Sequence, residues 1–181
     1  MDTLDTLEKK EIKELISKGW ITHDAMWFVH CLQEFGIEKT NKLNRAAVKS
    51  MSAIEVGRLK KAVGVTKDEF DTFDELMEFI NGAFELVLAD FMQVKFNSPS
   101  KNILHWEMEK DKCFAYKGMC RLGVSDKYEC GVLHRIECWL DTLNIQYTMT
   151  PKVIKCLMHY IRRVFRRLYS EFALIEAPWS G

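Results

Sequence analysis

The chain has 181 residues, with 26 lysines and arginines against 26 aspartates and glutamates, so its formal net charge at neutral pH is zero. Such a chain has no general attraction to nucleic acid or to an anionic membrane surface, and neither partner is expected. Apolar residues make up 48% of the chain and there are three prolines, which excludes a disordered protein and favours long helices.

The N-terminal stretch MDTLDTLEKKEIKEL is acidic and amphipathic and lacks the apolar core of a signal peptide. No window of 18 uncharged apolar residues is present, so no membrane-spanning helix is expected. These features predict a cytoplasmic protein. In that compartment the six cysteines are expected to be thiols or metal ligands before disulfides.

Helical spacing of apolar residues dominates the first half of the chain. The predicted helices cover residues 5–19, 22–35, 38–63 and 69–90. Gly19, Gly36 and Gly64 follow the first three, as helix-ending glycines do.

The period changes at Phe91, where apolar and polar residues begin to alternate and continue to Met108 around the polar loop SPSK. This predicts an antiparallel hairpin, followed by helices over 111–122 and 129–143. Residues 152–168 fit either a helix opening at Thr150-Pro151 or a strand, and SEFALI alternates as a strand. At least one strand beyond the hairpin is expected, because an isolated hairpin is only marginally stable.

The predicted fold class is therefore α+β. An N-terminal helical half of about residues 1–90 packs with a mixed half of about 91–181, which holds an antiparallel sheet of three to five strands and further helices. A single domain over 1–181 is expected, since no linker rich in proline or serine separates the halves.

The first candidate site lies on two neighbouring helices. His23, Trp27, His30 and Glu34 share one helical stripe, with Asp24 beside it. The next helix carries polar residues on a seam with core-facing spacing: Asn41, Asn44, Val48, Met51, Glu55, Arg58 and Ala62.

Two interpretations of this seam stay open. In one it is a solvated face or a structural network, in which Glu55 pairs with Arg58. In the other it lines a pocket, where Arg58 grips a carboxylate and Asn44 fixes polar groups. The predicted ligand-binding residues are His23, Asp24, Trp27, Asn44, Glu55 and Arg58.

The second candidate site surrounds Cys130, which precedes a predicted helix start where free amide groups stabilise a thiolate. His134 lies one turn later on the same face, so Cys130 and His134 are a candidate nucleophile and base, with Glu137 placed to orient the imidazole. The alternative is that the cysteines fill the core as small apolar residues.

No metal or cofactor is expected, because neither C-x-x-C nor H-E-x-x-H is present. A metal site would need Cys130 and His134 to meet Cys156 and His159. The basic run RRVFRR at 162–167 is expected to pair with acidic helices or to mark a partner surface.

A resemblance adds to these expectations. The resemblance depends on three segments: GWITHDAMWFVHCLQEFG, the helix that follows it, and CFAYKGMCRLGVSDKYECG. The matching positions are Trp20, Asp24, Trp27, Phe28, Gly36, Asn44, Glu55, Arg58, Cys113, Gly123, Tyr128 and Cys130. They resemble an uncharacterised family of small cytosolic prokaryotic proteins, itself similar to the L-2-amino-thiazoline-4-carboxylate hydrolase family. The resemblance implies a small α+β protein and a site shared by the helical motif and Cys130.

The sequence thus leads us to expect a protein that binds a small polar or anionic ligand. A hydrolase of a C–N bond with Cys130 as nucleophile is one version of this function. The alternatives are a non-catalytic sensor or interaction domain, which could be a homodimer, and a metal-binding regulatory domain.

Overall fold

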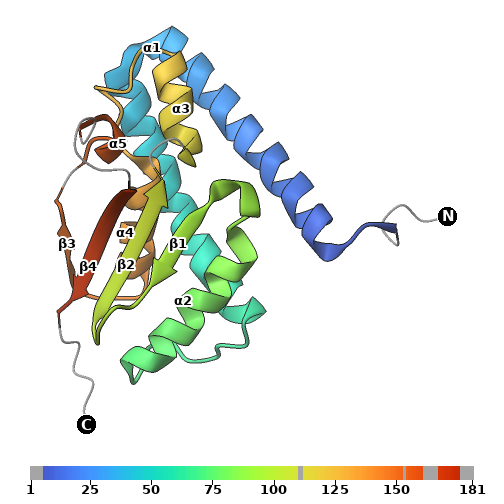
Figure 1. Ribbon diagram of the computed structural model, residues 1–181, viewed down its shortest axis with the longest axis vertical. Helices are drawn as coiled ribbons and strands as arrows, with labels where there is room; N and C mark the ends of the chain where they lie inside the picture. Colours follow the sequence, from blue (N-terminus) through green and yellow to red (C-terminus); the bar gives the residue numbers. More distant parts are fainter. Residues whose placement is uncertain (1–5, 110–111, 153, 161–166, 176–181) are drawn as a thin grey trace.

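The computed structural model describes residues 6–109, 112–152, 154–160 and 167–175, and it confirms the α+β class (Figure 1). The helices are α1 (Lys9–Ala62), α2 (Phe73–Val87), the 3-10 turn η2 (Asp90–Met92), α3 (Phe114–Arg121), α4 (Gly131–Thr142) and α5 (Leu157–Tyr160). The strands are β1 (Val94–Asn97), β2 (Ile103–Glu109), β3 (Tyr147–Thr150) and β4 (Arg167–Leu174).

The four strands form one antiparallel sheet in the order β1-β2-β4-β3. β2 is central, with Trp106 opposite Phe96 on β1 and Ser170 on β4. The predicted hairpin is confirmed, although it starts at Val94 because residues 90–92 form η2. The strand predicted for SEFALI is confirmed as part of β4.

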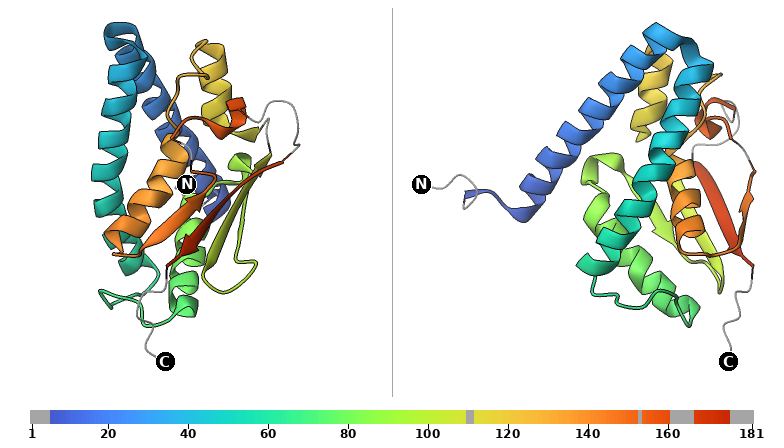
Figure 2. Two further views of the ribbon diagram at one scale, coloured as in Figure 1. Left: turned by 90° about the vertical axis from the view of Figure 1, so that its left-hand side faces the viewer. Right: turned by 180° about the vertical axis from the view of Figure 1, so that it is seen from behind.

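Helix α1 replaces the three helices that were expected between residues 5 and 63. It runs for 54 residues, and its single non-helical residue is Gly36, with φ 73° and ψ 171°. Gly19 stays helical on the exposed surface, so the expected helix end there is wrong. We call residues 9–35 the arm and residues 37–62 the stem. Figure 2 shows the two as the sides of a V that meet at Gly36.

Polar contacts hold the start of the arm to the last turn of α2 and to the segment that follows it. Lys10 forms an ion pair of 2.5 Å with Asp90, and Glu14 Oε1 accepts the Asp90 N–H at 2.7 Å. Lys13 Nζ donates to the Glu85 carbonyl at 2.6 Å. Near the other end of the arm, the Phe28 ring packs edge-on against Tyr128 with centroids 5.7 Å apart.

Residues 152–168, for which the sequence left helix and strand open, contain pieces of both in their described part. Thr150 ends β3, so no helix opens at Thr150-Pro151. Lys155 then makes an isolated antiparallel bridge with Glu129, and helix α5 covers only residues 157–160. Residues 161–166, which hold most of the basic run, lie outside the described residues.

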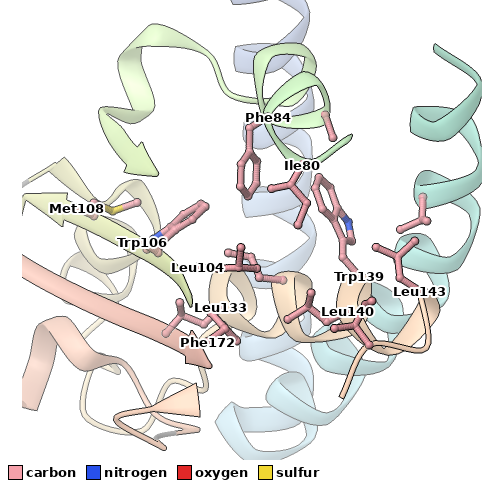
Figure 3. Close-up of a cluster of buried hydrophobic side chains, with 14 of the residues drawn as sticks. Ile80, Phe84, Leu104, Trp106, Met108, Leu133, Trp139, Leu140, Leu143 and Phe172 are labelled. Atoms are coloured by element: carbon pink, nitrogen blue, oxygen red, sulfur yellow. The ribbon is translucent and has the colours of Figure 1, made fainter. Parts of the chain in front are cut away.

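The core lies between the sheet and the helices α2 and α4 (Figure 3). Leu104 and Phe172 from the sheet and Leu140 from α4 are fully buried there. The rings of Phe84 and Trp139 stack at 5.5 Å with an interplanar angle of 25°, which joins α2 to α4. In the described part of the chain, no helix is both long and apolar enough to cross a membrane.

Candidate functional site

The stem and α4 are joined by an ion pair set among aromatic rings. Arg135 Nε donates to Glu55 Oε2 at 2.9 Å, and the Arg135 NH2 group donates to Oε1, so the guanidinium binds the carboxylate through two bonds. The Trp139 indole N–H also donates to Glu55 Oε2, at 2.8 Å. The guanidinium carbon lies 5.3 Å from the Trp20 ring centroid and 5.5 Å from that of Trp139. These contacts satisfy the half-buried carboxylate of Glu55 with residues of α4.

The six predicted ligand-binding residues are divided between this interface and the surface. Glu55 binds Arg135 as described, whereas Arg58, its expected partner, is exposed. Trp27 Nε1 donates to His23 Nε2 at 3.2 Å on the exposed arm, where Trp27 is 63% exposed. Asp24 also lies on the arm: partial burial raises the pKa of its carboxyl, and His23 and Arg135 act in the opposite direction. The role of these residues in ligand binding stays a prediction.

Asn41 fixes the turn that leads into α4. Its side chain, 4% exposed, donates to the Lys127 carbonyl at 2.9 Å and accepts the Glu129 N–H at 3.2 Å. The next stem residue on this face, Asn44, is half-buried, and its Nδ2 lies 3.0 Å from the point where a Cβ on Gly131 would stand. The two asparagines therefore belong to the packing of the stem against the start of α4.

Cys130 lies in a small apolar cavity of about 40 Å³. The cavity is lined by Trp106, Met108, Cys113, Ala115, Tyr128, Cys130, Val132, Leu133, Cys156, Leu157 and Met158. The bridge between Glu129 and Lys155 places Tyr128, Cys130 and Cys156 on one side of the paired chains, because side chains alternate along a strand. Burial raises the pKa of Cys130 to about 12, so this thiol is protonated at neutral pH.

His134 lies beside a different thiol from the one that the sequence indicated. Its Nδ1 is 3.3 Å from Glu137 Oε2, the carboxylate that was expected to orient it. The Cys138 Sγ is 3.5 Å from His134 Nε2 and 3.8 Å from Nδ1. A sulfur at nearly equal distances from both nitrogens does not lie along the lone pair of either. Catalysis by Cys130 and His134 stays a prediction. The thiol beside His134 is that of the buried Cys138, and the imidazole would have to turn for one nitrogen to face the sulfur.

A wider groove of about 550 Å³ lies where α4 meets the edge strand β3. Its walls are Glu137, Asp141, Ile145, Gln146, Tyr147, Thr148, Met149, Lys152 and Ile175. Burial raises the pKa of Tyr147, and the nearby carboxylates of Asp141 and Glu137 raise it further. The groove therefore combines apolar side chains with two carboxylates and one lysine.

Within the described ranges, no group of three or more histidine, cysteine, aspartate or glutamate side chains is arranged to hold a metal ion. His159, one of the four candidate ligands, has its Nδ1 3.0 Å from Ser125 Oγ, while His134 lies against Glu137. The candidate metal set of Cys130, His134, Cys156 and His159 is thus not assembled in the described structure.

Sequence reasoning missed Arg135, Trp139 and Cys138, which make the contacts around Glu55 and His134. Their spacing offered a signal: Arg135 and Trp139 are four residues apart on one face of α4, and so are His134 and Cys138. Nothing in the sequence showed that the first of these faces meets Glu55.

Comparison with known proteins identifies the family of the chain. A family model described as a family of unknown function (DUF6125) matches residues 4–174, so the chain belongs to this family. No curated protein and no solved structure matches the chain. The comparisons do not link it to the L-2-amino-thiazoline-4-carboxylate hydrolase family.

Proposed function

We propose that this protein binds a small polar molecule carrying a cationic amine, in the groove between α4 and β3. The observation that carries the proposal is the pair of carboxylates, Glu137 and Asp141, one turn apart in a groove of about 550 Å³. Pockets for small molecules have volumes of roughly 300–1,000 Å³ and combine apolar walls with a few convergent polar groups.

The charges of the groove favour an amine over the anionic ligand that the sequence suggested. Its walls hold two carboxylates and one cation, Lys152. The pKa of Tyr147 is raised mainly by burial, and the carboxylates of Asp141 and Glu137 raise it further because they disfavour the phenolate. An ammonium group would neutralise the carboxylates, and Lys152 could bind a carbonyl or carboxylate oxygen at the other end of the ligand.

Four probes with the same four-carbon chain separate the contribution of the ammonium group from that of the carboxylate: putrescine, 4-aminobutyrate, succinate and 1,4-butanediol. Titration calorimetry on the wild-type chain should show binding of the two amines and none of the diol or the dicarboxylate. Asp141→Asn should lower the affinity for putrescine at least tenfold, which corresponds to a loss of about 1.4 kcal/mol in binding free energy. Asp126→Asn, which removes the same charge outside the groove, is the matched control. Equal affinity in wild type and Asp141→Asn would refute the proposal.

A second candidate function is cysteine-dependent cleavage of a C–N bond in such a ligand. The contacts of His134 with Glu137 and Cys138 favour it, since Glu137 also lines the groove. In this reaction the Cys138 sulfur would add to the carbonyl carbon while His134 takes the thiol proton. His134 would return that proton to the amine as the C–N bond breaks, and water would hydrolyse the thioester.

Burial raises the pKa of Cys138, and Asp141 and Glu137 raise it further, while Arg45 and Lys49 lower it. The thiol would therefore need the imidazole to ionise it. Lysine p-nitroanilide, an amide with a cationic side chain, provides the test. Release of nitroaniline that is lost in Cys138→Ser and kept in Cys130→Ala would identify Cys138 as the nucleophile, and the reverse result would identify Cys130. No release by the wild type would exclude hydrolysis of this amide and leave the binding proposal to the calorimetry.

A further inference from the structure

The outer face of the arm exposes large apolar side chains. Leu15 is 67% exposed, Ile16 65%, Met26 49% and Trp27 63%. Along this face, residues recur at alternating steps of three and four, the spacing of one helical seam: Ile16, Gly19, His23, Met26 and His30. An apolar patch of this kind on one helix indicates a surface that another protein covers.

The contacts that hold the arm to the rest of the molecule lie on its other side. Lys10 and Glu14 contact Asp90 after α2, and Lys13 contacts the last turn of α2. Phe28 packs on Tyr128. Figure 1 shows the arm projecting from the body with its far side away from the sheet and the other helices. The arm is therefore anchored while its apolar face is left for a partner.

The stem has an outer seam of matching length. Its exposed residues recur at steps of four and three: Leu43, Ala47, Ser50, Ile54, Gly57 and Lys61. Leu43 is 50% exposed and Ile54 58% exposed. Small residues between these two leave room for bulky side chains of an opposing helix, and the arm carries such side chains.

We propose that the partner is a second copy of this chain, and that the arm of each copy lies along the stem of the other. A two-fold axis would then repeat the same arm–stem contact twice and close the assembly as a dimer. Gly36 divides α1 into two sides of nearly equal length, so each arm can cover a whole stem.

The charges of the two surfaces favour the arm–stem pairing. The arm has a formal charge of 4 − 4 = 0, because Lys9, Lys10, Lys13 and Lys18 balance Glu11, Glu14, Asp24 and Glu34; all four lysines lie before Gly19, so residues 19–35 hold only the two acidic residues. The stem carries Lys39, Lys42, Arg45, Lys49, Arg58, Lys60 and Lys61 against Glu38 and Glu55. The stem has a formal charge of 7 − 2 = +5, so a stem–stem contact would place like charges opposite one another. An arm–stem contact avoids this repulsion, because the arm is neutral and its half next to Gly36 is acidic.

The size of the contact is that of a stable interface. The arm and the stem are each about 26 residues long, which is roughly 40 Å, and roughly 10 Å wide. One face of either helix therefore has an area of about 400 Å². Two arms and two stems together give about 1,600 Å², the typical area of a specific complex.

Sedimentation velocity of the full chain over a range of concentrations tests the proposal. The wild type should reach twice its mass of 21.2 kDa, whereas Ile16→Glu on the arm and Ile54→Glu on the stem should each remain monomeric. Leu86→Glu, an exposed apolar residue of α2, is the matched control and should dimerise like the wild type. Circular dichroism shows whether each variant keeps its helical content.

Mixing the two monomeric variants separates this arrangement from others. The pair of Ile16→Glu and Ile54→Glu chains keeps one unaltered arm opposite one unaltered stem, so the mixture should form a heterodimer although neither variant forms a dimer alone. A monomeric wild type would overturn the proposal, as would dimers of either folded variant. A mixture that stays monomeric would also overturn the reciprocal arrangement. These outcomes are independent of ligand binding in the groove.

Discussion

Arg135 of α4 binds Glu55 of the stem through two hydrogen bonds, with its guanidinium between the rings of Trp20 and Trp139. The pair links the arm, the stem and α4 at one point. Only a planar guanidinium can both bind a carboxylate through two bonds and lie against an indole face.

Arg135→Lys keeps the charge and removes this geometry. We expect the free energy of unfolding to fall by roughly 1–2 kcal/mol, since both side chains are only partly buried. Urea denaturation measures the change, with Arg121→Lys on the exposed surface of α3 as the control. An Arg135→Lys variant as stable as the control would contradict this account of the interface.

Gly36 is the point where α1 bends, and its φ of 73° is a conformation that side chains disfavour. Gly36→Ala should therefore lower the free energy of unfolding by about 1–2 kcal/mol, although a Cβ there meets no atom within 4 Å. Gly118→Ala, inside α3 with similar open space, should instead raise it by up to about 1 kcal/mol. Thermal unfolding of both variants tests the two predictions. A Gly36→Ala variant at least as stable as the wild type would show that the bend does not depend on the glycine.

Asn41 is the buried side chain that binds both Lys127 and Glu129. Asn41→Ala would leave a carbonyl and an amide without their partner, at a cost of roughly 1–3 kcal/mol in unfolding free energy. Asn97→Ala on the exposed surface of β1 should change it by less than about 0.5 kcal/mol. Hydrogen exchange of the Glu129 amide offers a direct check, because its protection should fall in Asn41→Ala and stay unchanged in the control.

The thiols of Cys130 and Cys113 have raised pKa values, about 12 and about 11, because both are buried. An unfolded chain ionises its thiols near their ordinary pKa of 9, so above that pH the folded state holds more protons than the unfolded state. The stability of the fold should therefore decrease as the pH rises from about 9 towards 12.

Iodoacetamide labelling of the native chain at pH 8 gives the matching chemical readout. The exposed Cys120 should react first, and Cys130 should react slowly because its pKa is raised to about 12. Peptide mapping that found Cys130 among the fastest thiols would contradict its burial and would favour its predicted role as a nucleophile.

Much of the fold followed from periodicity. Apolar residues recur at helical spacing in α2 and α4 and alternate with polar residues in the β1–β2 hairpin. These elements could be predicted because each buries one face in the core. The strand of SEFALI was predicted, but the choice between helix and strand for residues 152–168 could not be made, because β4 pairs with β2, whose partner residues lie about 65 positions earlier in the chain. A helical spacing there competed with this distant pairing, and the pairing prevailed.

The candidate site was harder to predict for a related reason. Glu55 was expected to use the local partner Arg58, but burial against α4 brought Arg135 to it from a distant segment. His134 and Glu137 were predicted to meet because they share one helical turn, and they do. Cys130 precedes that helix, and its side chain enters the apolar cavity instead. Spacing within one helix was informative, whereas contacts between helices depended on the packing.

The central claim, that a cationic ligand binds between α4 and β3, is tested most directly by mapping amide chemical shifts of the ¹⁵N-labelled chain during titration with putrescine. We predict saturable shifts that are confined to residues 137–152 and Ile175 and that disappear in Asp141→Asn. Shifts centred on the arm around His23 and Trp27, or the absence of any saturable shift, would contradict the claim.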